Sequence, residues 1–296
     1  MSVIPRRPPV SPAIALFIAL TTAAAAQEAP TPSNASPAVT TGPADLADSA
    51  AAYDDDSAPV LAEPDFRVLN LPSTLRLPRH GSNFQLTHRF NGNLRRGSLG
   101  GNAGNLFGLD QGAAVGFEYR FGVARHLQAA VYRTAIDKAL QFYGKYDGLR
   151  QGGAIPVSLS ALVSVEGADN FQERYSPALG VVVSRMAGER LAVYATPVWV
   201  HNTAALLGVD RDTVFVGAGG RVRIGGSVYV VAEVAPRIGG YQPDKPAYGF
   251  GIEKRAGGHL FQLNFNNGQG TTFGQLASGG SPNSLYLGFN LARKFF

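Results

Sequence analysis

The chain has no cysteine, few charged residues and no long hydrophobic run. The absence of cysteine excludes disulfides, thiolate metal sites, a cysteine nucleophile and a lipid-modified N-terminal cysteine. Charged residues make up 16% of the 296 residues, against about 25% in ordinary soluble proteins. No apolar run reaches the roughly 18 residues that a membrane-spanning helix needs, which excludes a helical membrane protein. The sequence is instead rich in glycine, with 36 residues, and 45% apolar.

The first 26 residues have the pattern of a secretory signal peptide. Arg6 and Arg7 form a positive start, residues 13–20 a short apolar core, and three alanines at 24–26 a small-residue cleavage site. We therefore predict that residues 1–26 are removed on export and that the mature protein resides in the bacterial outer membrane.

Residues 27–66 differ in composition from the rest of the chain. They are rich in Ala, Pro, Ser and Thr, and they contain eight acidic residues but no Lys or Arg. Such a segment buries too little apolar surface to offset its chain entropy, so it is predicted to be a disordered acidic linker, followed by a lead-in segment at 67–81. The linker could enter the lumen of a basic barrel as a plug, or remain a solvated tail that binds a periplasmic partner.

From Ser82 to Phe296 the apolar pattern has a period of two, which indicates half-buried strands. Glycine-rich turns separate stretches of about ten residues. Twelve strands are predicted, near 82–90, 114–121, 126–134, 139–147, 157–166, 177–185, 191–200, 213–224, 228–236, 247–254, 259–266 and 284–295. Long and short connections largely alternate, so one end carries loops and the other tight turns. We therefore predict that residues 82–296 are all-β: a transmembrane antiparallel up-and-down β-barrel of about 12 strands, within a range of 10–14.

A secreted soluble β-sandwich or barrel is the alternative fold, because its strands also alternate. Two features favour the membrane barrel. Charges are sparse within the strands and fall opposite the aromatic residues, as in Val115–Phe121, and the chain ends in an amphipathic strand that stops at Phe296.

That last strand resembles the signal by which outer-membrane barrels are recognised by their assembly machinery. The residues that carry the resemblance are Phe289, Leu291, Phe295 and Phe296. Several motifs also resemble an uncharacterised bacterial family of membrane-bound β-barrel domains: Thr87-His88-Arg89-Phe90, Leu106-Phe107-Gly108-Leu109-Asp110, Glu118-Tyr119-Arg120-Phe121-Gly122, Leu140-Gln141-Phe142-Tyr143-Gly144-Lys145-Tyr146 and Asn290-Leu291-Ala292-Arg293-Lys294-Phe295. The resemblance implies the fold and the membrane location, and brings no substrate or catalytic residue with it.

The alternation assigns a set of charged residues to the barrel lumen. The lumen-lining candidates are Arg89, Glu118, Arg120, Lys145, Glu166, Arg221, Arg223, Glu233 and Arg237, with Asp147, Glu253 and Lys294 on the same faces. These charges suit a narrow, porin-like channel for small solutes, whose lining would slightly prefer anions. They equally suit a closed barrel braced by ion pairs, which would bind a partner through its long loops at 91–113 and 267–283 or through its linker.

Signals for other functions are weak. The five histidines show no metal-ligand spacing, and there is no GxSxG or GxxxxGK[ST] motif, so no catalytic, metal or cofactor-binding residue is predicted. A lipid-facing hydrolase built around His88 is the third hypothesis for the function. Basic residues do not form a nucleic-acid motif; Arg95, Arg96 and Arg211 are expected to meet lipopolysaccharide phosphates among the outer-membrane lipids.

Overall fold

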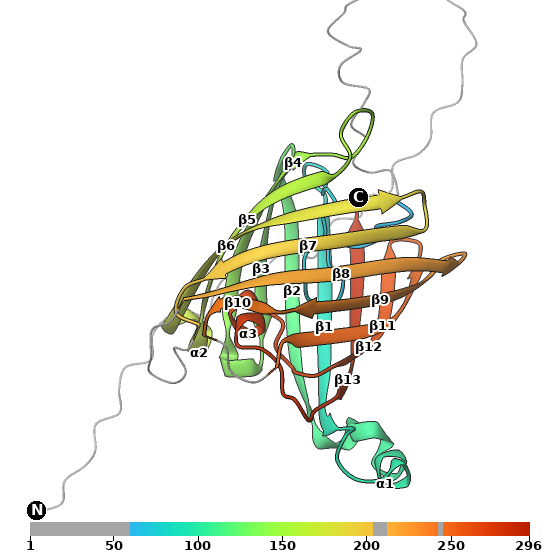
Figure 1. Cartoon of the computed structure of the whole chain (residues 1–296), viewed down its shortest axis with the longest axis vertical. Helices are drawn as coiled ribbons and strands as arrows, with labels where there is room; N and C mark the ends of the chain where they lie inside the picture. Colours follow the sequence, from blue (N-terminus) through green and yellow to red (C-terminus); the bar gives the residue numbers. More distant parts are fainter. Residues whose placement is uncertain (1–59, 204–211, 242–244) are drawn as a thin grey trace, which may run out of the picture. The chain divides into compact units, whose positions relative to one another are not determined.

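Alternating side chains and short turns produce twelve antiparallel strands that close into a barrel (Figure 1). The computed structural model describes residues 60–203, 212–241 and 245–296. The predicted signal peptide and residues 27–59 of the predicted linker lie outside these ranges, as does Arg211. None of the helices among the described residues is long and apolar enough to cross a membrane.

Each strand of the barrel pairs with its neighbour in chain order. Every predicted strand overlaps one of these, so the predicted all-β fold and the number of strands are confirmed. The strands are β1 (Ser82–Asn93), β2 (Ala113–Ala124), β3 (Leu127–Thr134), β4 (Leu140–Leu149), β5 (Ser158–Gly167), β6 (Glu173–Ala187), β7 (Leu191–Val200), β8 (Thr213–Gly225), β9 (Val228–Ala235), β11 (Ala247–Ala256), β12 (His259–Asn266) and β13 (Tyr286–Phe295).

The barrel closes between its first and last strands. Ser82 of β1 pairs with Phe295 of β13 on one side and with Phe121 of β2 on the other. The short strand β10 (Arg237–Gly240) continues β9 after Pro236, whose missing N–H interrupts the ladder. Because every strand of the barrel has two neighbours, the wall has no open edge.

The two ends of the barrel differ. Tight turns at 125–126, 188–190, 226–227 and 257–258 lie at the end where β1 begins and β13 ends. Short helices occupy connections at the opposite end: α1 (Leu99–Gly104) and η1 (Leu106–Gln111) between β1 and β2, η2 (Ile136–Lys138), α2 (Ala168–Phe171), and α3 (Phe273–Ala277) between β12 and β13.

The outer and inner faces of the wall differ as the alternation predicts. Apolar side chains such as Phe117, Tyr119, Phe250 and Phe261 point outward and are 46–48% exposed. Charged and amide side chains such as Glu118, Arg120 and Asn264 point inward and are buried. The inner face of β5–β8 is more apolar, where Val182, Val198 and Phe215 form a cluster with residues of α3.

Candidate functional site

The barrel lumen is filled by the part of the chain that precedes β1. Residues 60–77, here called the inner segment, lie inside the wall, and Phe66, Val68, Leu69 and Leu71 are fully buried. The sequence prediction was wrong for residues 60–66, which were assigned to the disordered linker. The composition of residues 27–66 predicts disorder. In the folded protein, however, the lumen provides hydrogen-bond partners and an apolar surface against which residues 60–66 pack.

Polar side chains of the wall bind the carbonyl groups of the inner segment. Arg221 donates from Nη2 to the carbonyl oxygen of Arg67 at 2.7 Å, and Gln262 from Nε2 to that of Val68 at 2.7 Å. Further along, Lys145 Nζ donates to the carbonyl oxygens of Ser73 and Leu75, at 2.7 and 3.0 Å. Because a buried carbonyl without a partner is costly, these contacts allow an irregular chain to lie inside the barrel.

Glu233 of β9 binds the N–H groups of the same segment. Its carboxylate accepts hydrogen bonds from the backbone nitrogens of Leu69, Asn70 and Leu71 at 3.0–3.1 Å, and from the Asn70 side chain at 2.9 Å. Three successive N–H groups thus converge on one carboxylate, which offsets the cost of burying its charge.

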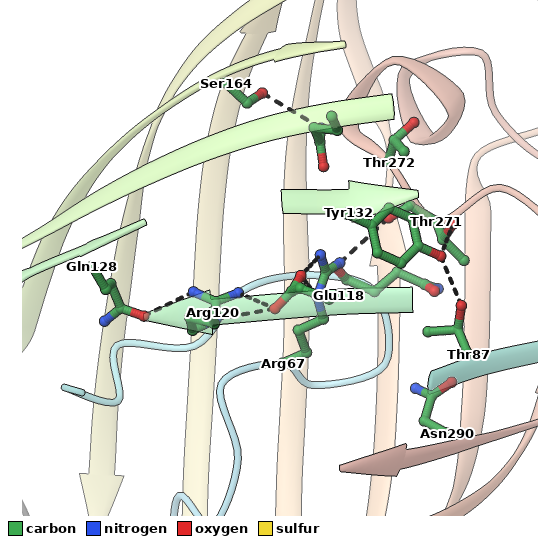
Figure 2. A network of polar contacts seen from close by, with 12 residues as sticks. Arg67, Thr87, Glu118, Arg120, Gln128, Tyr132, Ser164, Thr271, Thr272 and Asn290 are labelled. Atoms are coloured by element: carbon green, nitrogen blue, oxygen red, sulfur yellow. Dashed lines mark hydrogen bonds and ion pairs between the residues drawn. The ribbon is translucent and has the colours of Figure 1, made fainter. Parts of the chain in front are cut away.

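A row of charged groups ties the segment to β2 (Figure 2). The Glu118 carboxylate forms ion pairs with both Arg67 of the inner segment and Arg120 of its own strand. Arg120 also donates to Gln128 Oε1 of β3 at 2.8 Å, and Arg67 lies over the Tyr132 ring at 5.3 Å. Glu118 is 1% exposed, so both guanidinium groups depend on it as a buried counter-ion.

Two further ion pairs lie within the wall. Lys145 Nζ is 2.9 Å from Asp147 Oδ1 of the same strand, β4. Arg221 Nε of β8 is 2.5 Å from Glu253 Oε1 of β11. Arg89 of β1 donates to Asn70 of the inner segment at 2.9 Å and to Asn290 of β13 at 2.8 Å. These wall charges are therefore engaged with one another, with neutral side chains of the wall or with the inner segment.

The connection between β12 and β13, residues 267–285, also turns into the lumen; we call it the inward loop. Its helix α3 begins with a capping box between Thr272 and Gln275, and Phe273 is buried. The loop is fixed to the wall where Tyr132 and Thr271 share a hydrogen bond of 2.7 Å (Figure 2). A second contact is the hydrogen bond from Gly274 N to Glu166 at 3.2 Å. The loop also meets the inner segment, since Arg67 Nη1 donates to the carbonyl oxygen of Thr271 at 3.4 Å.

Together the inner segment and the inward loop occlude the lumen. Arg89, Arg120, Lys145 and Arg221 point into the barrel, yet each is at most 1% exposed. Side chains that line an open channel would be accessible to water, so at these positions the barrel is closed. The closed state nevertheless contains unfavourable groups. Asn83 and Gln85 of β1 are buried with unpaired amides, and burial raises the pKa of the Asp65 carboxyl to about 6.

The sequence-predicted residues fall into three groups. Arg89, Glu118, Arg120, Lys145, Glu166, Arg221 and Glu233 are buried inside the barrel. Arg223 and Arg237 are only partly buried: Arg223 pairs with the exposed Glu189 beside a tight turn, and Arg237 donates to the carbonyl oxygen of Lys245. The residues of the predicted assembly signal, Phe289, Leu291, Phe295 and Phe296, are partly or largely exposed, and their role stays a prediction.

The inward-facing charges of the strands are of both signs. Arg89, Arg120, Lys145 and Arg221 are buried inside the barrel together with Glu118, Asp147, Glu166, Glu233 and Glu253, while Arg223, Arg237 and Lys294 are partly buried. Several of these charges pair with one another, and a preference of the lumen for anions stays a prediction.

Sequence reasoning missed the neutral side chains that hold the inner segment, above all Gln128, Gln262 and Asn290. All three lie on the polar face of a predicted strand, and this feature of the sequence could have identified them as inward-facing. Within the part of the chain that the structure describes, no group of three His, Asp or Glu side chains could hold a metal ion. The His88 ring stacks on Phe289, and its Nδ1 has no hydrogen-bond partner among the described residues.

Truncating Glu233 tests how strongly the wall holds the inner segment. In Glu233→Ala three buried N–H groups lose their acceptor, and each unpaired group costs about 1–3 kcal/mol. With Val68→Cys as a single reactive site in this cysteine-free chain, we expect labelling by a water-soluble maleimide to accelerate at least tenfold. The lipid-facing change Val230→Ala on the same strand is the control. Equal labelling rates in both variants would show that Glu233 does not anchor the segment.

The closed wall, the apolar outer face and the polar lumen define a membrane-bound β-barrel with an occluded interior. The chain belongs to the family described as membrane bound beta barrel domain (DUF5777), whose model matches residues 64–295. The match includes most of the inner segment as well as the wall. A comparison with curated proteins finds no match.

Solved structures similar to this chain include several outer membrane proteins. The NanC porin is 9% identical with a TM-score of 0.46, over 73% of this chain and 99% of that one. An outer membrane channel from Pseudomonas putida F1 is 13% identical with a TM-score of 0.44, over 74% and 97%. The outer membrane channel DcaP of Acinetobacter baumannii is 10% identical with a TM-score of 0.32, over 73% and 74%.

Proposed function

We propose that this protein is a channel for small hydrophilic solutes in the bacterial outer membrane, and that the inner segment keeps it shut until the segment is displaced. The observation that carries the proposal is that the strand pairing of the wall does not involve the inner segment. β1 pairs with β13 and β2 along its length, and the inner segment contributes no strand to the barrel. Its removal therefore breaks no hydrogen bond of the wall's ladder.

The surface behind the inner segment supports the same proposal. Arg221, Glu233 and Gln262 would face the lumen if the segment left, and a surface of this kind is wetted by water. The hydrogen bonds between the segment and the wall can be exchanged for hydrogen bonds to water, while displacement also exposes the apolar side chains Phe66, Val68, Leu69 and Leu71 at a free-energy cost. The unpaired groups of Asn83 and Gln85 lower the cost of opening further, because water would satisfy them.

The proposed location rests on the predicted signal peptide together with the barrel fold, since closed barrels satisfy every backbone group within lipid. The proposal that the protein is not an enzyme rests on the engagement of the lumen charges with one another. Barrel assembly machinery, lipopolysaccharide and a periplasmic partner for residues 27–66 are the proposed partners.

Conductance across a planar bilayer tests the function. The mature full chain and a variant lacking residues 60–77 are compared, with folding checked by heat-modifiable migration in gels. Current from the shortened variant and silence from the full chain support the proposal. Silence from both folded proteins rejects it in favour of a permanently closed barrel that binds partners through its loops.

A further inference from the structure

A polar hollow lies at the long-loop end of the barrel, separate from the occluded lumen. Its volume is about 320 Å³, which is in the range of pockets that hold small ligands. The end of β1, the connection formed by α1 and η1, and Tyr286 at the start of β13 line it. The lining is strongly polar, with amide side chains supplied by Asn91, Asn93, Asn102, Asn105 and Gln111.

Three of these amides build the walls of the hollow. Asn91 Nδ2 donates to the carbonyl oxygen of Gln111 at 3.2 Å, and Asn102 Nδ2 donates to that of Leu94 at 2.8 Å. Asn93 donates to Ser284 Oγ at 3.0 Å and accepts from Leu285 N at 3.1 Å, which joins the wall to the inward loop. The hollow is therefore shaped before any ligand arrives.

A close backbone crossing fixes the connection onto β1. A Cβ placed on Gly92 would lie 2.2 Å from the Cα of Gly108, so no side chain fits at that contact. Gly108 also has a φ of +90°, a conformation that glycine adopts readily. The two glycines hold η1 at a fixed distance from the strand and leave the hollow open beside them.

A second set of lining groups forms no hydrogen bond within the described residues. It comprises the Arg96 guanidinium, the side-chain amides of Asn105 and Gln111, and the Tyr286 hydroxyl. An amide both donates and accepts hydrogen bonds, which matches the hydroxyl groups of a sugar. The guanidinium is a planar, permanently charged fork that binds phosphate through two parallel hydrogen bonds.

We propose that this hollow binds a phosphorylated sugar, with Asn105 and Gln111 contacting its hydroxyls and Arg96 its phosphate. The site is independent of the lumen, so it does not require the barrel to conduct. The same chemistry is offered by a free sugar phosphate and by the phosphorylated saccharide of a membrane lipid. In the second case the loops would bind the lipids that surround the barrel.

The neighbouring arginine provides a matched control. Arg95 donates from Nη2 to Tyr248 Oη at 3.2 Å and does not line the hollow, whereas Arg96 lines it. Arg96→Gln and Arg95→Gln therefore remove the same charge from adjacent positions. A charge effect spread over the loop would change both variants, and a site in the hollow changes only the first.

Calorimetric titration of the folded, detergent-solubilised full chain with glucose 1-phosphate tests the proposal, with glucose and inorganic phosphate as partial probes. We expect saturable binding of glucose 1-phosphate and weaker binding of each partial probe. The affinity for glucose 1-phosphate should fall at least tenfold in Arg96→Gln and Asn105→Ala, and change less than twofold in Arg95→Gln.

Co-sedimentation with vesicles with and without lipopolysaccharide then distinguishes the two sources of the ligand. Selective binding to lipopolysaccharide that Arg96→Gln abolishes identifies the lipid, and equal binding to both vesicles identifies the free solute. Absence of binding to every probe, or equal losses in the two arginine variants, overturns the proposal.

Discussion

A variant lacking residues 60–77 is expected to give steady single-channel currents where the full chain gives almost none. The inner segment fills the space in front of Arg221, Glu233 and Gln262, and it shares no strand pairing with the wall. The barrel of the variant should therefore form with its ladder intact and a wetted lumen. Single-channel recording in planar bilayers at matched protein concentration measures the change, with an expected rise in current of at least tenfold.

The shortened barrel should also be narrow and weakly selective. The inward loop remains in place, because Tyr132 and Glu166 hold it to the wall independently of the inner segment. Inward charges of both signs, several of them paired with one another, predict a small reversal potential in a salt gradient. Deleting residues 27–59 instead is the control, and that protein is expected to stay silent because it keeps the inner segment. Currents of equal size from both deletions would contradict the assignment of residues 60–77 as the obstruction.

Replacing Glu118 by alanine is expected to release the inner segment without unfolding the wall. The change leaves Arg67 and Arg120 without their shared counter-ion, and breaking a buried ion pair in this way costs about 3–5 kcal/mol. Arg67 can regain water by leaving the lumen with its segment, while Arg120 keeps its hydrogen bond to Gln128. The equilibrium should therefore shift toward the displaced segment by about a hundredfold or more, since 1.36 kcal/mol corresponds to a factor of ten.

Maleimide labelling of Val68→Cys measures this release, because Val68 is fully buried when the segment is docked. Glu189→Ala is the matched control. Glu189 also pairs with an arginine, Arg223, but its side chain is 72% exposed, and exposed pairs contribute about 0–1 kcal/mol. We expect fast labelling in Glu118→Ala and an unchanged rate in Glu189→Ala. Slow labelling in both, with folded barrels, would show that the ion pair does not hold the segment.

The wall of the barrel could be predicted from sequence because each strand carries its own signal. In β12, Phe261 and Leu263 alternate with Gln262 and Asn264, and the structure places the first pair outside and the second inside. The orientation of such residues is set by the local period of two and needs no knowledge of distant parts of the chain. Arg223 is only partly buried because it lies beside a tight turn, where it donates to the carbonyl oxygen of Gly226.

The inner segment could not be predicted in the same way. It has no regular secondary structure apart from one bridge between Arg67 and Pro72, so it lacks any periodic pattern. Its partners are distant in sequence: Glu118 lies 51 residues from Arg67, and Glu233 lies 163 residues from Asn70. The acidic, proline-rich residues before it predict disorder, and this prediction extended to residues 60–66 because the wall that buries them is formed by strands much further along the chain.

The most direct test of the account fixes the inner segment to the wall by a reversible bond. The side chain of Val68 lies 3.4 Å from the position of a Cβ on Gly219 of β8, so cysteines at 68 and 219 should form a disulfide when the segment is docked. In the Glu118→Ala background, single-channel current from this double-cysteine protein is recorded before and after a reductant is added to the same membrane. We expect silence while the disulfide is intact and steady current once it is reduced. Equal current in the two states, with the cross-link verified, would contradict the claim that the inner segment closes the barrel.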